Sequence, residues 1–173
     1  MSAPNPFENS APVKLDELYQ EVILDHNRKP RHFGKLDDAT AYAHGVNPLC
    51  GDDFEVYLVL DAGGTVRKVA FQGQGCAISK ASASLMTDAV EGRTVKEVSD
   101  LKDHFIHLLI DATASPEHRE GVGKLKFFEG VKNFPVRVKC ATLAWRALEE
   151  ALKGGKTGPV STEDDAERKR ELS

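Results

Sequence analysis

Three cysteines and one aspartate are the residues whose types and spacing could do chemistry in this chain. The stretch NPLCGD, residues 47–52, places the thiol of Cys50 two residues before the carboxylate of Asp52. Cys76 follows the sequence GQG, and Cys140 lies on a later amphipathic segment. Proteins bind Zn²⁺ through four sulfur, nitrogen or oxygen ligands, and three thiolates with one carboxylate supply that number. These four side chains predict a metal site, provided that the fold brings them together.

The spacing of the cysteines also leaves a plainer interpretation open. Cys50 and Cys76 are 26 residues apart and Cys76 and Cys140 are 64 apart, which matches no short zinc-finger pattern. An intracellular cysteine is often a small buried hydrophobic residue, and NPLCGD is typical of a turn. The six histidines are scattered, and none lies at helical spacing from a cysteine. We interpret the histidines as surface or hydrogen-bonded residues.

The local sequence indicates how a metal site would be supported. Cys76 opens a helical segment, where the free N–H groups and the helix dipole lower the pKa of a thiol. Arg137 lies one helical turn before Cys140, so the two side chains share a face. One Zn²⁺ with four anionic ligands has a formal charge of about −2, from +2 for the metal and −4 for the ligands. Arg137 is placed to offset part of that charge.

Composition and charge exclude several classes of protein. The chain has 173 residues, of which 40% are hydrophobic and 29% charged, which suits one domain with a hydrophobic core. Its formal net charge of −4 gives no general attraction to nucleic acid, and its apolar runs are too short to span a membrane. The N-terminus lacks the features of a secretory signal. We therefore expect a cytoplasmic protein in a reducing compartment, where an odd number of thiols does not indicate a disulfide framework.

Hydrophobic periodicity divides the chain into elements. Apolar residues at helical spacing predict helices over 15–29, 76–92, 94–110 and 135–153. Strict alternation predicts an antiparallel hairpin over 53–75, with residues 40–46 as a third strand. Residues 111–130 contain Pro116 and several glycines but few core candidates, and predict an exposed, irregular insertion.

The order of these elements predicts the fold class and the domain limits. One helix, then strands, then a run of helices is typical of α+β proteins. We expect a small antiparallel three-stranded sheet packed against several helices. The expected domain covers residues 14–153, preceded by a flexible leader, 1–13, and followed by a mobile charged tail, 154–173, which has almost nothing to bury.

Three motifs in register carry a resemblance to a known family. NPLCGD at 47–52, GCAISKASAS at 75–84 and RVKCATLAW at 137–145 resemble the SufU branch of the IscU/NifU N-terminal family of iron–sulfur cluster assembly proteins. The opening helix, LYQEVILDHNRKPRHFG, fits as well. Scaffold members of this family usually have a histidine immediately before the third cysteine, where this chain has Lys139. They also have a shorter span between the second and third cysteines.

The resemblance implies an IscU/SufU-like fold with zinc held by Cys50, Asp52, Cys76 and Cys140. It implies that Cys50 accepts persulfide sulfur from a SufS-type PLP-dependent cysteine desulfurase and passes it on to downstream cluster-assembly proteins. A histidine of the desulfurase would replace the acceptor cysteine on zinc, and Arg137 would neutralise the site and hold or steer Cys50. Two alternatives stay open: a scaffold that binds iron or a transient iron–sulfur cluster through the same cysteines, and a binding module whose zinc is only structural.

Overall fold

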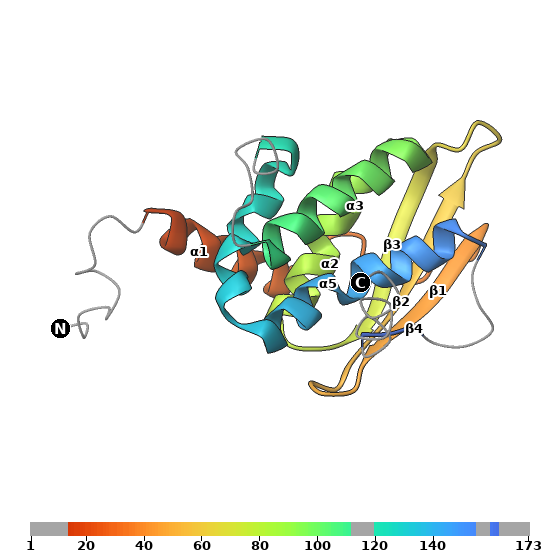
Figure 1. The fold of residues 1–173 in the computed structure, drawn as a ribbon. Coiled ribbons are helices and arrows are strands. Elements are labelled where there is room, and N and C mark those ends of the chain that lie inside the picture. The colour runs from red at the N-terminus through yellow and green to blue at the C-terminus, as the bar shows by residue number, and fades with distance from the viewer. Residues whose placement is uncertain (1–13, 112–119, 155–159, 163–173) are drawn as a thin grey trace, which may run out of the picture.

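The structure is a computed structural model and describes residues 14–111, 120–154 and 160–162. The elements are, in chain order, α1 (Lys14–Arg28), β1 (Ala41–Asn47), β2 (Asp52–Leu60), β3 (Val66–Gln74), α2 (Ala77–Val90), α3 (Val95–Ile110), the 3₁₀ helix η1 (Gly123–Asn133), α5 (Pro135–Leu152) and β4 (Val160–Ser161). Strands β1, β2 and β3 form an antiparallel sheet, with helices packed against it (Figure 1). The predicted α+β fold and its three-stranded sheet are therefore confirmed. No helix in these ranges is long and apolar enough to cross a membrane.

The sheet buries one face against α5. The alternation in β2 turns Phe54 and Val56 inward, where both are fully buried. On β1, a β-carbon at Gly45 would lie 3.1 Å from Leu143 Cδ1 and 3.2 Å from Ala147 Cβ. The absence of a side chain at Gly45 therefore lets α5 approach the sheet closely, which brings the first turns of α5 near the end of β1.

Helices α2 and α5 pack against each other through small residues and one aromatic side chain. Ser82 Oγ on α2 donates a hydrogen bond to the carbonyl oxygen of Ala141 at 2.5 Å and accepts one from Trp145 Nε1 at 3.3 Å. The ring of Trp145 is fully buried, and its centroid is 5.1 Å from that of Phe105 on α3. The Ala- and Ser-rich composition of α2 thus fixes the distance between the two helices that carry Cys76 and Cys140 at their N-terminal ends.

The predicted exposed, irregular insertion over 111–130 is wrong for the part that the structure describes. Three apolar residues of this segment enter the core at spacings of three, Val122, Leu125 and Phe128, and Val131 just after it continues the spacing. A 3₁₀ helix has about three residues per turn, so this spacing places all four on one side of η1. The glycines and Pro116 are typical of a loop, which is why the sequence predicted one. Pro116 itself lies outside the described residues.

The predicted leader, residues 1–13, also lies outside the described residues, but part of the predicted tail does not. Val160 and Ser161 form β4, which runs parallel to β1 at the free edge of the sheet, so that the strand order is β3-β2-β1-β4. The backbone N–H of Thr162 donates to the carbonyl oxygen of Val46 at 3.1 Å, and Thr162 is buried. The predicted mobile tail, 154–173, therefore needs a correction at residues 160–162.

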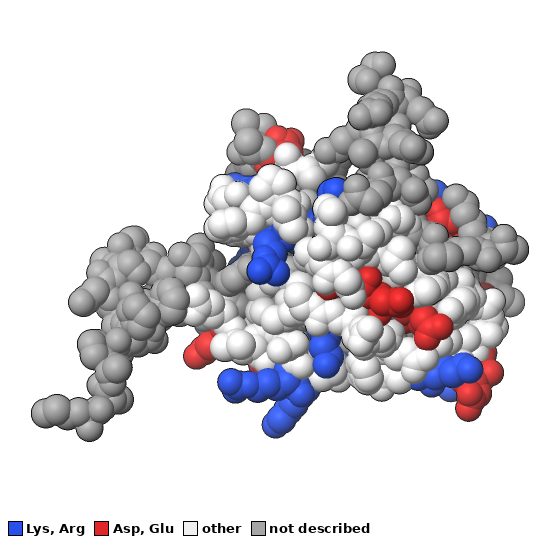
Figure 2. Space-filling view, turned by 90° about the horizontal axis from the view of Figure 1, so that it is seen from below, with Lys and Arg blue, Asp and Glu red and all other residues white. Residues whose placement is uncertain are grey.

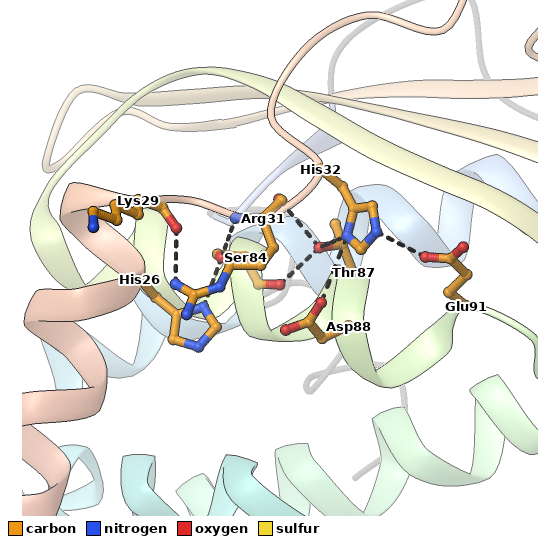
Figure 3. A network of polar contacts seen from close by, with 8 residues as sticks. All are labelled: His26, Lys29, Arg31, His32, Ser84, Thr87, Asp88 and Glu91. Atoms are coloured by element: carbon orange, nitrogen blue, oxygen red, sulfur yellow. Dashed lines mark hydrogen bonds and ion pairs between the residues drawn. The ribbon is translucent and has the colours of Figure 1, made fainter.

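Polar side chains hold the connection between α1 and β1 against α2 (Figure 3). His26 Nδ1 lies 2.7 Å from the hydroxyl of Ser84, which also accepts a hydrogen bond from the backbone N–H of Arg31 at 2.8 Å. His32 Nδ1 lies 3.0 Å from the hydroxyl of Thr87. Both histidines are hydrogen-bonded, in agreement with the sequence interpretation, and the serine and threonine are interior residues of α2.

His26 makes the stability of this connection dependent on pH. Burial, with the nearby Arg31 cation, lowers its pKa below the ordinary value. Above about pH 6.5 the imidazole is neutral in both states; on acidification the unfolded chain takes up the proton first, so stability falls until the pH passes the folded-state pKa. We expect the difference in unfolding free energy between wild type and His26→Gln to shrink from pH 7 to pH 5. Urea unfolding at several pH values measures this difference, and a constant value would contradict the prediction.

Candidate metal centre

The β1–β2 turn places Cys50 and Asp52 at one end of the sheet. Asn47 ends β1, and Asp52 begins β2 directly opposite it. The backbone N–H groups of Cys50 and Gly51 both donate to the carbonyl oxygen of Asn47, at 3.3 and 2.9 Å. Gly51 has φ of +71°, a left-handed conformation that glycine adopts without strain. The turn leaves Cys50 half-buried and Asp52 fully buried.

Cys76 lies where β3 meets α2, as the N-cap residue of that helix. Its Sγ accepts a hydrogen bond from the backbone N–H of Ser79 at 3.4 Å, and its own N–H donates to Asp52 Oδ1 at 2.9 Å. A β-carbon on Gly75 would lie 2.4 Å from Ser79 Oγ and 2.8 Å from Asp52 Oδ1. Glycine at 75 is therefore what allows this junction to approach Asp52.

Cys140 reaches the same place from the second turn of α5. It is fully buried, and its Sγ lies 3.4 Å from Cys50 Sγ. Both cysteines are free thiols. Asn47 Nδ2 donates to Cys140 Sγ at 3.5 Å and to Asp52 Oδ2 at 3.2 Å. Asn47, to which the sequence analysis assigned no role, thus lies between two of the predicted ligands.

Three of the four predicted ligands form one cluster. One ligand atom each from Cys50, Asp52 and Cys140 lies within 4.8 Å of the others. Bonds of about 2.0 to 2.3 Å around a tetrahedral zinc put neighbouring ligand atoms about 3.3 to 3.8 Å apart, and the Cys50–Cys140 separation is already in that range. If both thiols were deprotonated, they and the buried carboxylate would repel one another, and a bound cation would offset that repulsion. The residues present therefore fit a bound thiophilic metal, either zinc or iron.

Cys76 lies beside this cluster, and its surroundings lower the pKa of its thiol. Hydrogen bonding to the Cys140 thiol lowers the pKa of Cys76 to about 5, with a further contribution from the backbone N–H of Ser79. The same contact, together with burial, raises the pKa of Cys140. The sequence predicted a lowered pKa for Cys76 from its place at a helix N-terminus alone, whereas the hydrogen bond with Cys140 is the largest cause. As the fourth ligand, Cys76 stays a prediction.

Arg137 lies in the first turn of α5, before Cys140. Its backbone N–H donates to the carbonyl oxygen of Phe134 at 2.8 Å, and its side chain is exposed. Within the described ranges its guanidinium makes no hydrogen bond or ion pair. The predicted role of Arg137 in neutralising the site and holding Cys50 therefore stays a prediction.

Exposed apolar side chains lie on the two segments that carry Cys50 and Cys140. Leu49, next to Cys50, is 61% exposed; Phe134 and Val136, at the start of α5, are 61% and 51% exposed. Because Cys50 and Cys140 are in contact, these three side chains belong to one end of the molecule. Figure 2 shows the molecule from below, the end at which the β1–β2 turn lies in Figure 1, and much of this surface carries neither Lys, Arg, Asp nor Glu. An apolar surface beside a reactive site is typical of a docking surface for another protein.

Comparison with known proteins agrees with this arrangement. A model of the NifU-like N terminal domain matches residues 18–141. The iron-sulfur cluster assembly scaffold protein IscU of Streptococcus pyogenes is 41% identical over 140 residues, covering 81% of this chain and 86% of that protein. The zinc-dependent sulfurtransferase SufU of Bacillus subtilis is 39% identical over 142 residues, covering 81% of this chain and 92% of its own length.

A solved structure shows the same fold. The N-terminal part of a nitrogen-fixing NifU-like protein from Brucella abortus superposes with a TM-score of 0.70 at 28% identity, covering 81% of this chain and 95% of that one. The named relatives are divided between IscU and SufU at nearly equal identity. The range that the family model matches, 18–141, contains Cys50, Asp52, Cys76 and Cys140, and the chain belongs to the family of the NifU-like N-terminal domain.

Proposed function

We propose that this protein serves iron–sulfur cluster assembly as a zinc-dependent sulfurtransferase. In this proposal Cys50 accepts the persulfide sulfur of a SufS-type PLP-dependent cysteine desulfurase and passes it on to downstream assembly proteins. The observation that carries the proposal is the contact of Cys50, on a turn, with Cys140 and Asp52, which are buried. Cys76 and Cys140 are held by helices, so Cys50 is the thiol that can leave the cluster with the smallest change in the fold.

The transfer is balanced in atoms and electrons. The Cys50 thiolate attacks the outer sulfur of the donor persulfide, the donor S–S bond breaks, and the donor cysteine leaves as a thiolate. A new S–S bond makes the persulfide on Cys50, without net oxidation. Zinc, when bound, would keep its thiol ligands deprotonated. Asp52, Cys76 and Cys140 would hold the metal while Cys50 reacts.

The surface around Cys50 supports delivery by a protein rather than by a small molecule. A persulfide carried on a protein must be brought to the acceptor with water excluded, since water and free thiols compete for it. The apolar side chains of Leu49, Phe134 and Val136 offer such a contact around Cys50. Arg137, exposed among them, would meet the negative charge of the approaching persulfide.

The alternative function is a scaffold on which an iron–sulfur cluster is built. The observation that favours it is the similarity to the Streptococcus pyogenes protein, which is named an iron-sulfur cluster assembly scaffold protein. The same thiolates suit iron as well as zinc. Lys139 supports the sulfurtransferase, because the position before Cys140 offers an ammonium group in place of a histidine ligand.

Metal analysis combined with mass spectrometry tests the proposal. The purified protein is analysed for zinc, iron and acid-labile sulfide, then incubated with a SufS-type desulfurase and cysteine, and its peptides are mapped. We expect about one zinc per chain, as four ligands bind one ion, and one added sulfur on Cys50. A sample without cysteine is the control. Iron with acid-labile sulfide and no sulfur adduct would instead support the scaffold.

A further inference from the structure

Asn47 is fully buried at the end of β1 and makes side-chain contacts on both sides. Its Nδ2 donates to Asp52 Oδ2 at 3.2 Å and to Cys140 Sγ at 3.5 Å. Its Oδ1 accepts a hydrogen bond from the hydroxyl of Thr162 at 3.2 Å. The NH₂ group of Asn47 thus faces two predicted ligands, Asp52 and Cys140. Its carbonyl oxygen is held by Thr162, from the C-terminal segment.

The direction of the amide follows from charge. An Asn47 side chain turned by half a rotation would aim its oxygen at a carboxylate and a thiol sulfur, which repel it when they are anionic. The hydroxyl of Thr162, which donates to Oδ1, stabilises the orientation in which the NH₂ group faces both ligands. Removing that hydroxyl without changing the shape would leave a buried carbonyl oxygen without its donor.

The main chain holds Thr162 at this place. Strand β4 pairs with β1 at Gly45 and Val46, and the N–H of Thr162 donates to the carbonyl oxygen of Val46. Thr162 is therefore fixed to the strand that ends in Asn47. It also lies beyond residues 18–141, the range that the family model matches.

We infer that Asn47 and Thr162 form a positioning pair for the metal ligands. Thr162 fixes the amide of Asn47, and that amide fixes Asp52 and Cys140 relative to each other. The inference rests on the proposed zinc site and adds to it a residue pair that orients the ligands without touching the metal. Partners of this kind cost about 10- to 100-fold in metal affinity when they are removed.

The test measures zinc affinity by competition with a chromogenic chelator. Thr162→Val keeps the shape and removes the hydroxyl, and we expect it to weaken zinc binding about tenfold. Thr162→Ser restores the hydroxyl and should bind zinc as the wild type does. Thr142→Val is the matched control, because Thr142 is also buried but its hydroxyl donates to the carbonyl oxygen of Lys139.

A double-mutant cycle and a spectroscopic readout separate positioning from a general loss of stability. In an Asn47→Ala background, Thr162→Val should cause no further loss of zinc affinity, since the hydroxyl acts through the amide. With Co²⁺ in place of zinc, the d–d bands should shift in Thr162→Val and return in Thr162→Ser. The unfolding midpoint of each metal-free variant is recorded beside these values.

The outcomes distinguish this inference from the proposed function. The positioning pair would be overturned if Thr162→Val bound zinc as tightly as the wild type. It would also be overturned if Thr162→Val lowered zinc affinity by the same factor in the Asn47→Ala background as in the wild type. Either result would leave the zinc site intact. If the wild-type protein itself bound no zinc, the proposed function would fail and the positioning pair with it. The pair would be established by three results together. Thr162→Val lowers zinc affinity tenfold, Thr162→Ser binds zinc as the wild type does, and Thr162→Val has no further effect when residue 47 is already alanine.

Discussion

Replacing Cys50 with alanine should reduce the desulfurase to the rate that it shows without this protein. The substitution removes the only group in the proposal that receives sulfur, so no amount of the variant should stimulate turnover. Zinc should still bind, but more weakly, because Asp52, Cys76 and Cys140 remain. Alanine formation from cysteine, measured at several concentrations of the variant, checks the rate, and chelator competition checks the metal.

The Cys50 variant needs a control that keeps the acceptor and changes another thiol. Cys140→Ser removes a buried ligand and should lower zinc affinity, while sulfur is still found on Cys50 at a reduced rate. The two variants therefore separate sulfur acceptance from metal binding. Full stimulation by Cys50→Ala would sink the proposal and direct attention to Cys76, whose lowered pKa makes it the next nucleophile.

Gly75→Ala should disable the metal site although residue 75 binds nothing. The new β-carbon would lie 2.4 Å from Ser79 Oγ and 2.8 Å from both Asp52 Oδ1 and Phe54 Cε2. Phe54 is fully buried in the sheet, so relief must come from Asp52 and Ser79, which hold the backbone and thiol of Cys76. We expect zinc affinity to fall by about 100-fold and the free energy of unfolding by about 1–3 kcal/mol.

Gly130→Ala is the matched control for this substitution. A β-carbon at Gly130 meets nothing within 4 Å, and the residue does not have a left-handed backbone. Its zinc affinity and unfolding curve should be close to those of the wild type. Zinc affinity unchanged in Gly75→Ala would show that the junction between β3 and α2 can move away from Asp52 without disturbing the ligands.

The sequence predicted the parts of this structure that depend on local patterns. The alternation in β2 and β3 predicted the hairpin, and the helical spacing predicted α2, α3 and α5 to within a few residues. The position of Cys76 at the start of a helix is of the same kind, because a helix N-terminus is marked by its neighbours. The prediction that Cys50 and Cys140 converge rested on the resemblance to a family, because cysteines this far apart in sequence carry no geometric information.

The features that the sequence analysis missed depend on period or on distance along the chain. Helix η1 was missed because its apolar residues, Leu125 and Phe128 among them, recur every third residue, which is neither a strand nor an α-helix period. The contact of Asn47 with Thr162 spans 115 positions of the sequence. A threonine among polar residues gives no local sign that it will be buried. The motif NPLCGD did mark Asn47 as part of a turn, although not as a partner of Asp52 and Cys140.

The cluster residues are far apart in the chain, so they are translated at different times and the cluster can form only late in synthesis. Cys50, Asp52 and Cys76 leave the ribosome early, while Cys140 comes 90 residues after Cys50 and Thr162 later still. Because Cys140 belongs to α5, which packs on β1 and β2, the full set of thiols meets only when the last helix has docked on the sheet. In the proposed function, a metal could therefore meet its complete ligand set only after the last helix has been translated, and a chain truncated before Cys140 would lack one of the proposed ligands.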